Sequence, residues 1–274
     1  MEDYFDINSP HFMELAKKQN LPADIIWQNE NVYIQVDINP ITVGHLLIIP
    51  KNNEFTAIHS YNKNESENEI KIKEKIKESV DEAIKYLSSL RGDDKEICFF
   101  EHGSMGETCR AGSCFGHAHL HALFFNRDKD KKYWDRPLNS VKINTALDMV
   151  CPYRKRKFIY SNMSDMDDYY ERAIASRRKE QNDIGYIKYA FTFRDFQNRD
   201  EIFDEAEFGV DFPIESQTLQ RAVAIALGVP YKNWKVAIQD GSNRELYLQT
   251  LEFIKERQKI FGLQNKNTSD TMEL

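Results

Sequence analysis

The sequence contains little cysteine and no long apolar run. Its four cysteines, at positions 98, 109, 114 and 151, are few for 274 residues and have no regular spacing, so a disulfide framework is not expected. No run of about 18 apolar residues occurs, which excludes an ordinary membrane span. The polar start MEDYFDINSP has neither the basic nor the apolar region of a signal peptide. We therefore expect a cytoplasmic protein with reduced thiols and no membrane partner.

Acidic residues outnumber basic ones, 44 to 37. The net charge of -7 argues against a protein that coats bare nucleic acid, and we interpret the basic run RKRK at 154–157 as solvated surface. Hydrophobic residues make up 41% and charged residues 30%, which is typical of a globular protein. The length allows one large domain, or a domain of about 125 residues with a substantial second part.

Short β-rich runs dominate the first half of the chain. Two lie within residues 21–37, and three more follow at 44–50, 96–102 and 117–125. One long amphipathic helix is predicted over residues 66–90, because apolar residues recur at steps of three and four: Ile72, Ile76, Val80, Ala83, Leu87 and Leu90. Closely spaced strands favour an antiparallel α+β sheet over alternating β-α-β units.

A short helix is predicted at about residues 10–20. The second half of the chain is harder to divide into elements: helices are predicted at 140–150, 165–181, 212–230 and 243–261, with a strand at 186–193. We expect residues 1–127 to form a catalytic domain with a long packing helix. Residues 128–262 would be an α/β extension packed on it, and 263–274 a frayed tail.

The stretch GHAHLH at 116–121 holds three of the seven histidines in the chain. Side chains alternate between the faces of a strand, so His117, His119 and His121 share one face, spaced roughly 6.5 to 7 Å apart. The small apolar residues between them would pack on the core helix. The imidazoles would then face a cleft or solvent, because burying them without partners is costly.

Three hypotheses explain such a face. The histidines could be the polar edge of a strand without a function. They could bind zinc, with His45, Asp37 or Cys114 as a further ligand. They could also serve phosphoryl or nucleotidyl transfer, because an imidazole is neutral or protonated near physiological pH and acts as nucleophile or hydrogen-bond donor.

Two separated motifs resemble the histidine-triad (HIT) superfamily of nucleotide hydrolases and transferases. HAHLHAL matches its His-φ-His-φ-His-φ-φ pattern, where φ is an apolar residue. The upstream segment LPADIIWQNENVYIQVDINPITVGHLLIIPK resembles the N-terminal half of these proteins, including the spacing between Asp37 and His45. The resemblance covers roughly residues 10–127 and implies an antiparallel sheet with a long packed helix.

The resemblance also implies site residues. His119 would attack an α-phosphorus and form a nucleotidyl-histidine that water hydrolyses. His117, His121 and His45 would bind phosphate oxygens, and Ser113 or Cys114 in the preceding loop would also bind phosphate. Asp37 would bind the ribose, and Phe12 and Met13 would contact the base. No metal is required by this scheme, and zinc remains the alternative cofactor. The partner would be a nucleotide, and nucleic acid is not expected.

The resemblance leaves the exact activity open. His121 at the third triad position favours hydrolysis, releasing a nucleoside monophosphate from a dinucleoside polyphosphate or other nucleotidyl conjugate; transferases and phosphorylases tend to have Gln there. The segment FPIESQTLQRAVAIALGVPYKNWK resembles the C-terminal part of larger members, including dinucleoside polyphosphate phosphorylases and CwfJ-like proteins. A non-catalytic nucleotide- or RNA-binding module is therefore a third hypothesis. Homodimers are common in the family, but the extension could cover that surface.

Two features depart from the family pattern. The loop before the triad is AGSCFG instead of Gly-Gln-Ser/Thr-φ, and Glu101 stands where many relatives have Asn. A carboxylate beside a phosphate site would repel it unless it is turned away or paired.

Overall fold

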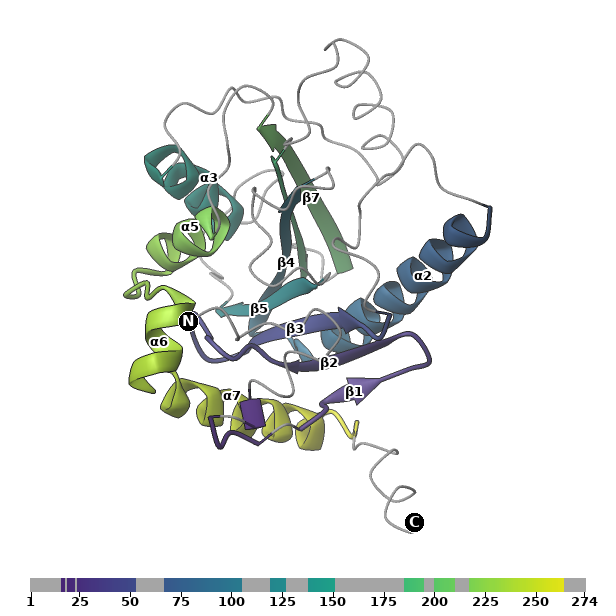
Figure 1. The fold of residues 1–274 in the computed structure, drawn as a ribbon, viewed down its shortest axis with the longest axis horizontal. Coiled ribbons are helices and arrows are strands. Elements are labelled where there is room, and N and C mark those ends of the chain that lie inside the picture. The colour runs from purple at the N-terminus through teal and green to yellow at the C-terminus, as the bar shows by residue number, and fades with distance from the viewer. Residues whose placement is uncertain are drawn as a thin grey trace.

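The computed structural model describes residues 16–17, 19–22, 24–52, 67–104, 119–126, 138–150, 185–194, 200–209 and 217–263. In this part of the chain a seven-stranded antiparallel sheet forms the centre of the molecule (Figure 1). Its strand order is β1 (Trp27–Gln28), β2 (Val32–Val36), β3 (His45–Pro50), β5 (Leu120–Asn126), β4 (Lys95–Ser104), β6 (Gly185–Arg194) and β7 (Asp200–Gly209). The predicted α+β class is confirmed.

The described helices are α2 (Glu67–Leu90), α3 (Leu138–Val150), α5 (Thr218–Leu227), α6 (Trp234–Asp240) and α7 (Arg244–Ile260). α2 is the predicted long helix, and it ends before Gly92, which has the positive φ of 65° common after helices. The helix expected at 165–181 lies outside the described residues, and of the one expected at 10–20 only residues 16 and 17 are described as helical.

α2 and α7 pack against one face of the sheet. The predicted apolar stripe of α2 meets the even-numbered residues of β5, Leu120, Ala122 and Phe124, while α7 adds Tyr247 and Leu251 to the same cluster. Each large apolar side chain buried in this way contributes roughly 1.5 to 3 kcal/mol. The triad strand therefore presents its small apolar face to the core helix, as the sequence predicts.

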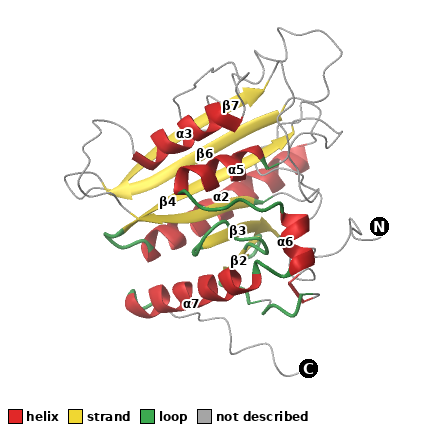
Figure 2. Cartoon of the chain, turned by 90° about the vertical axis from the view of Figure 1, so that its left-hand side faces the viewer, coloured by secondary structure: helices red, strands yellow, loops and turns green. Residues whose placement is uncertain are grey.

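α3 and α5 lie over the opposite face. Figure 2 shows them in front of the strands, with α2 behind. Their apolar residues, among them Leu147 and Val223, pack on Cys98, Phe100 and Leu123 of β4 and β5. Because Leu123 is two residues from His121, the face that α3 and α5 partly cover is also the face of the triad histidines.

The second half of the chain completes the sheet. β6 pairs with β4 from Ile97 opposite Thr192 to Ser104 opposite Gly185, and β7 pairs with β6. The strand predicted at 186–193 is thus confirmed, whereas β7 and α6 were not predicted. Among the described helices none is both long and apolar enough to cross a membrane.

Candidate active site

Three neighbouring strands bring four of the predicted residues together: Asp37, His45, His119 and His121, here called the histidine site. In the strand register, His121 of β5 lies opposite Leu47 of β3, two residues from His45. Asp37 follows the last residue of β2, and its backbone N–H donates to the carbonyl of His45 at 3.2 Å. Alternation along each strand then places these side chains on one face.

His45 and His121 form a buried imidazole pair. The Nε2 atom of His45 lies 3.0 Å from Nδ1 of His121. Oδ2 of Asp37 lies 3.4 Å from each of these two nitrogens, while its other oxygen accepts the N–H of Asn39 at 2.8 Å. The carboxylate therefore faces the pair and stabilises positive charge that develops on it.

The backbone of the β2–β3 loop decides which nitrogen of His45 carries hydrogen. The N–H of Ile41 donates to Nδ1 of His45 at 3.1 Å. A backbone N–H can only donate, so this Nδ1 is unprotonated and a neutral His45 carries its hydrogen on Nε2. Nε2–H then donates to Nδ1 of His121, and a neutral His121 carries its own hydrogen on Nε2. The N–H of Ile41 thus determines which nitrogen carries hydrogen in both rings.

His45 is neutral over the physiological pH range. Complete burial lowers its pKa to about 3, the Asp37 carboxylate opposes the shift, and His121 and His119 add to it. The cost of placing charge on a fully buried ring exceeds the attraction of one carboxylate. His45 therefore acts as a hydrogen-bond donor to His121 and not as a cation.

Phe100 fixes the ring planes of the pair. Its ring stacks on His121 with centroids 4.5 Å apart and planes 10° apart, and on His45 at 5.8 Å. Phe100 is fully buried beneath the cluster that α3 and α5 complete. The imidazoles are therefore held by aromatic packing as well as by hydrogen bonds.

His119 lies at the start of this arrangement, one residue before β5. Its ring meets the edge of His121 at 4.8 Å between centroids and 76° between planes. It is 8% exposed, against 2% for His121 and 0% for His45. The sequence predicted that the histidines face a cleft or solvent. Of the triad, His119 and His121 are described, and both are mostly buried, because stacking and hydrogen bonds provide the partners that the prediction treated as absent.

Asp37, His45 and His121 are also a set that could hold a metal ion, with ligand atoms within 4.8 Å of one another. Their separations are close to the roughly 3.3 Å expected between ligands of tetrahedral zinc. The tautomer of His45 opposes this use. A metal-binding histidine normally donates its second ring N–H to an acceptor, whereas Nδ1 of His45 accepts from Ile41. The nitrogen facing the cluster therefore carries hydrogen in place of a free lone pair.

Several predicted site residues lie outside the described part of the chain: His117, Ser113, Cys114, Phe12 and Met13. Their roles stay predictions.

Glu101, which departs from the family pattern, is among the described residues. Regular alternation along β4 places Glu101 on the face opposite Phe100, away from the histidines. Carboxylate repulsion by Glu101 is therefore not a property of this site.

Three residues around the histidine site were not predicted from the sequence. Ile41 acts through its backbone, and no side-chain pattern reveals such a role. Phe100 resembles any core phenylalanine until the pairing of β4 with β5 sets it opposite His121. Gln35 is buried on the same face of β2 as Asp37, and no hydrogen bond to its Nε2 atom is found. The period of two along VYIQVD was the signal that could have revealed Gln35.

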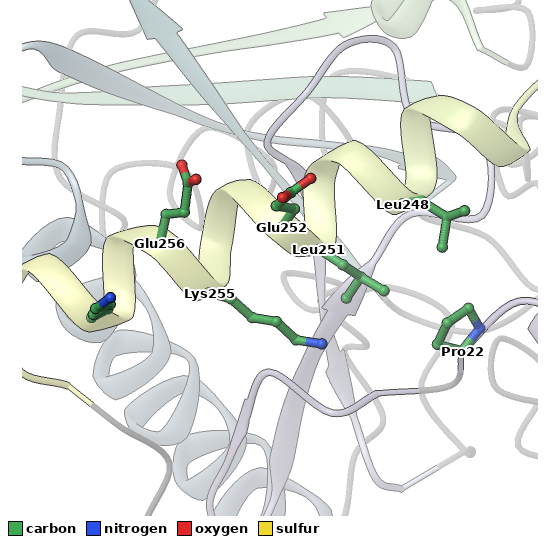
Figure 3. A pocket seen from close by; sticks show the side chains of 7 residues that line it. Pro22, Leu248, Leu251, Glu252, Lys255 and Glu256 are labelled. Carbon is green, nitrogen blue, oxygen red and sulfur yellow. The ribbon is translucent and has the colours of Figure 1, made fainter.

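A separate pocket lies along α7 (Figure 3). Its lining residues are Pro22, Leu248, Leu251, Glu252, Lys255, Glu256 and Lys259. None of them belongs to the histidine site, and Lys255 already lies 3.4 Å from Asp24. The pocket is open, and its charged groups lie on the surface of one helix, apart from the histidine site.

The comparison with protein families agrees with this geometry. The family model described as HIT domain matches residues 18–124. The matched span contains β1 to β4, most of β5, all of α2 and the whole histidine site.

Proposed function

Because this chain is a member of the HIT domain superfamily through residues 18–124, with an extra C-terminal region, we propose that it is a nucleotide hydrolase. The family consists typically of nucleotide hydrolases and transferases. The proposed reaction cleaves a dinucleoside polyphosphate or another nucleotidyl conjugate at its α-phosphate and releases a nucleoside monophosphate.

The observation that carries the proposal is the arrangement around His119. It is more exposed than His121 and His45, and its ring lies against His121, whose protons are ordered through His45 and Ile41. A neutral imidazole at the margin of a site is a competent nucleophile. An N–H held in a buried site stabilises negative charge on phosphate oxygens in the transition state.

The proposed chemistry has two displacements. A ring nitrogen of His119 attacks the α-phosphorus, a P–N bond forms, and the bond to the leaving-group oxygen breaks. Water then attacks the same phosphorus, the P–N bond breaks, and the water proton is lost as the nucleoside monophosphate forms. His121 would hold a phosphate oxygen through its Nε2–H. His45 would act through its hydrogen bond to His121, because both of its ring nitrogens are already engaged, and His117 would lie near the leaving group.

Asp37 has a more specific place in this scheme than ribose binding alone. Its Oδ2 atom lies 3.4 Å from both members of the imidazole pair, so we propose that the carboxylate also fixes the orientation of the pair by attracting the Nε2–H group of His45. Ribose hydroxyls would use the remaining lone pairs of the carboxylate.

The first test is His119→Ala. We expect turnover of a panel of nucleotidyl compounds to fall by at least about 10³-fold, because the attacking group is gone. Nucleotide binding and the melting temperature should change little. Lys142→Ala, at an exposed position of α3, is the matched control. Unchanged turnover in His119→Ala would contradict the proposal.

The same assay separates the alternatives. Adding inorganic phosphate should leave the product a monophosphate, whereas a phosphorylase would release a diphosphate. Salt-dependent RNA binding without any turnover would instead favour the CwfJ-like binding module. Running the assay with a chelator shows whether turnover depends on bound metal.

A further inference from the structure

The loop between β2 and β3, residues 37–44, carries both groups that order the imidazole pair: the carboxylate of Asp37 and the N–H of Ile41. Besides its internal hydrogen bond from Asn39 to Asp37, the loop is held from outside. Helix α7, which comes some two hundred residues later in the sequence and lies beside β2 in the fold (Figure 1), contacts both of its ends.

Thr250 of α7 holds the end of the loop that leads into His45. Its Oγ1 accepts the N–H of Gly44 at 3.2 Å and donates to the carbonyl of Leu246 at 2.8 Å. Gly44 has a φ of 88°, and a Cβ at this position would lie 3.2 Å from Cε1 of Phe253. The glycine therefore permits both the turn and the close approach of α7.

Asn243 holds the other end. As the residue before α7 it would be expected to cap the helix with its side chain, but no such hydrogen bond forms. Its Nδ2 donates instead to the carbonyl of Ile38 and, at 3.3 Å, to Oε1 of Gln19. The side chain is buried, so these bonds are not replaced by water. The asparagine is thus used for the loop and not for its own helix.

The middle of the loop is held by the same half of the chain. Nδ2 of Asn39 donates to the carbonyl of Lys232, between α5 and α6, at 3.2 Å. The side chain of Ile41 packs on the cluster formed by α3 and α5. Ile41 consequently has little freedom to move its N–H away from His45.

From these contacts we infer that Thr250 and Asn243 are positioning residues, through which the C-terminal region sets the tautomer and orientation of His45. Neither residue touches the imidazoles, and both act through the 37–44 loop. The consequence for catalysis rests on the proposed hydrolase function, whereas the consequence for the tautomer of His45 does not.

The decisive variant is Thr250→Val, which keeps the shape of the side chain and removes the acceptor of Gly44. Thr250→Ser keeps the hydroxyl and should restore the wild-type behaviour. Thr145→Val is the matched control, since Thr145 on α3 also donates to a carbonyl four residues earlier, at 2.9 Å, but is exposed. Asn243→Ser provides an independent test, because serine caps a helix as well as asparagine but is too short to reach Ile38.

Two measurements distinguish positioning from a purely structural role. In ¹⁵N-histidine NMR spectra of the full chain, the wild-type His45 should show an unprotonated Nδ1 and a protonated Nε2. Thr250→Val and Asn243→Ser should show a mixture of tautomers. Their kcat should fall about tenfold, the value of one lost hydrogen bond, with a smaller change in KM.

The outcomes separate the two claims. Wild-type nitrogen spectra in Thr250→Val and Asn243→Ser, even with lower melting temperatures, would overturn the inference and leave the hydrolase proposal intact. If the variants lose the single tautomer of His45 while the wild-type protein hydrolyses no nucleotide, the inference is supported and the hydrolase proposal is rejected. An equal effect of Thr145→Val would also overturn the inference.

Discussion

At the scale of single residues, His45 shows how much of a side chain's chemistry comes from its backbone surroundings. Burial removes its charge, and one amide N–H assigns its tautomer. The identity of the residue is visible in the sequence, but the chemistry it offers at a given pH is not, because desolvation and hydrogen bonding decide it.

The low pKa of His45 predicts a pH-dependent stability. An unfolded histidine titrates near pH 6.5, and the native His45 has a pKa of about 3. Between these values the unfolded state binds more protons. The contribution of neutral His45 to the free energy of unfolding is therefore fully present above about pH 6.5 and is lost as the pH drops towards 3. Melting curves across this window should show the loss.

His45→Gln is the control for this prediction, since glutamine does not titrate and retains an Nε2 donor. Its melting temperature should vary less with pH than that of the wild type. Equal slopes for the two proteins would show that other groups carry the acid sensitivity.

At the scale of elements, amphipathic periodicity is the most reliable signal in this chain. The stripe on α2 is buried as predicted because steps of three and four place its residues on one side of the helix. β7 shows the converse. Its sequence DEIFDEAEFG contains five acidic residues, which disfavour a strand by propensity. As the last strand of the sheet it tolerates charge, and charge at an edge discourages pairing with another chain.

Two substitutions on α2 test this packing. Leu87 is fully buried, so Leu87→Ala should lower the free energy of unfolding by about 2 to 5 kcal/mol. Ile70 lies on the same helix but is 45% exposed, so Ile70→Ala should stay within about 0.5 kcal/mol. Denaturant titration of both variants measures the difference. Similar costs would mean that the helix does not present the described stripe to the sheet.

At the scale of the whole molecule, the C-terminal region packs closely against the part of the chain that the HIT domain matches. It adds two strands to the edge at β4, covers Phe100 and Leu123 with α3 and α5, and holds the β2–β3 loop with α7. We therefore propose that residue 127, where the resemblance to the family ends, is not a boundary between two independently folding units.

Truncation tests this proposal. A chain of residues 1–127 would expose the pairing edge of β4 and the apolar face beneath α3 and α5, so we expect it to aggregate or to lose its cooperative unfolding transition. A chain of residues 1–263 keeps every described contact and should melt like the full protein. A soluble, cooperatively folding 1–127 chain would refute the proposal. Size-exclusion chromatography and calorimetry distinguish the outcomes.

The sequence by itself determined the strands and helices with regular periodicity, the shared face of His119 and His121, and the two motifs that identify the family. These features depend on residues close together in the chain, or on a spacing that the chain preserves. Only the tertiary structure decided the tautomer of His45, the stacking of Phe100, the edge position of β7 and the use of Thr250 and Asn243. Those follow from hydrogen bonds and packing between segments as far as 224 residues apart, which no local pattern encodes.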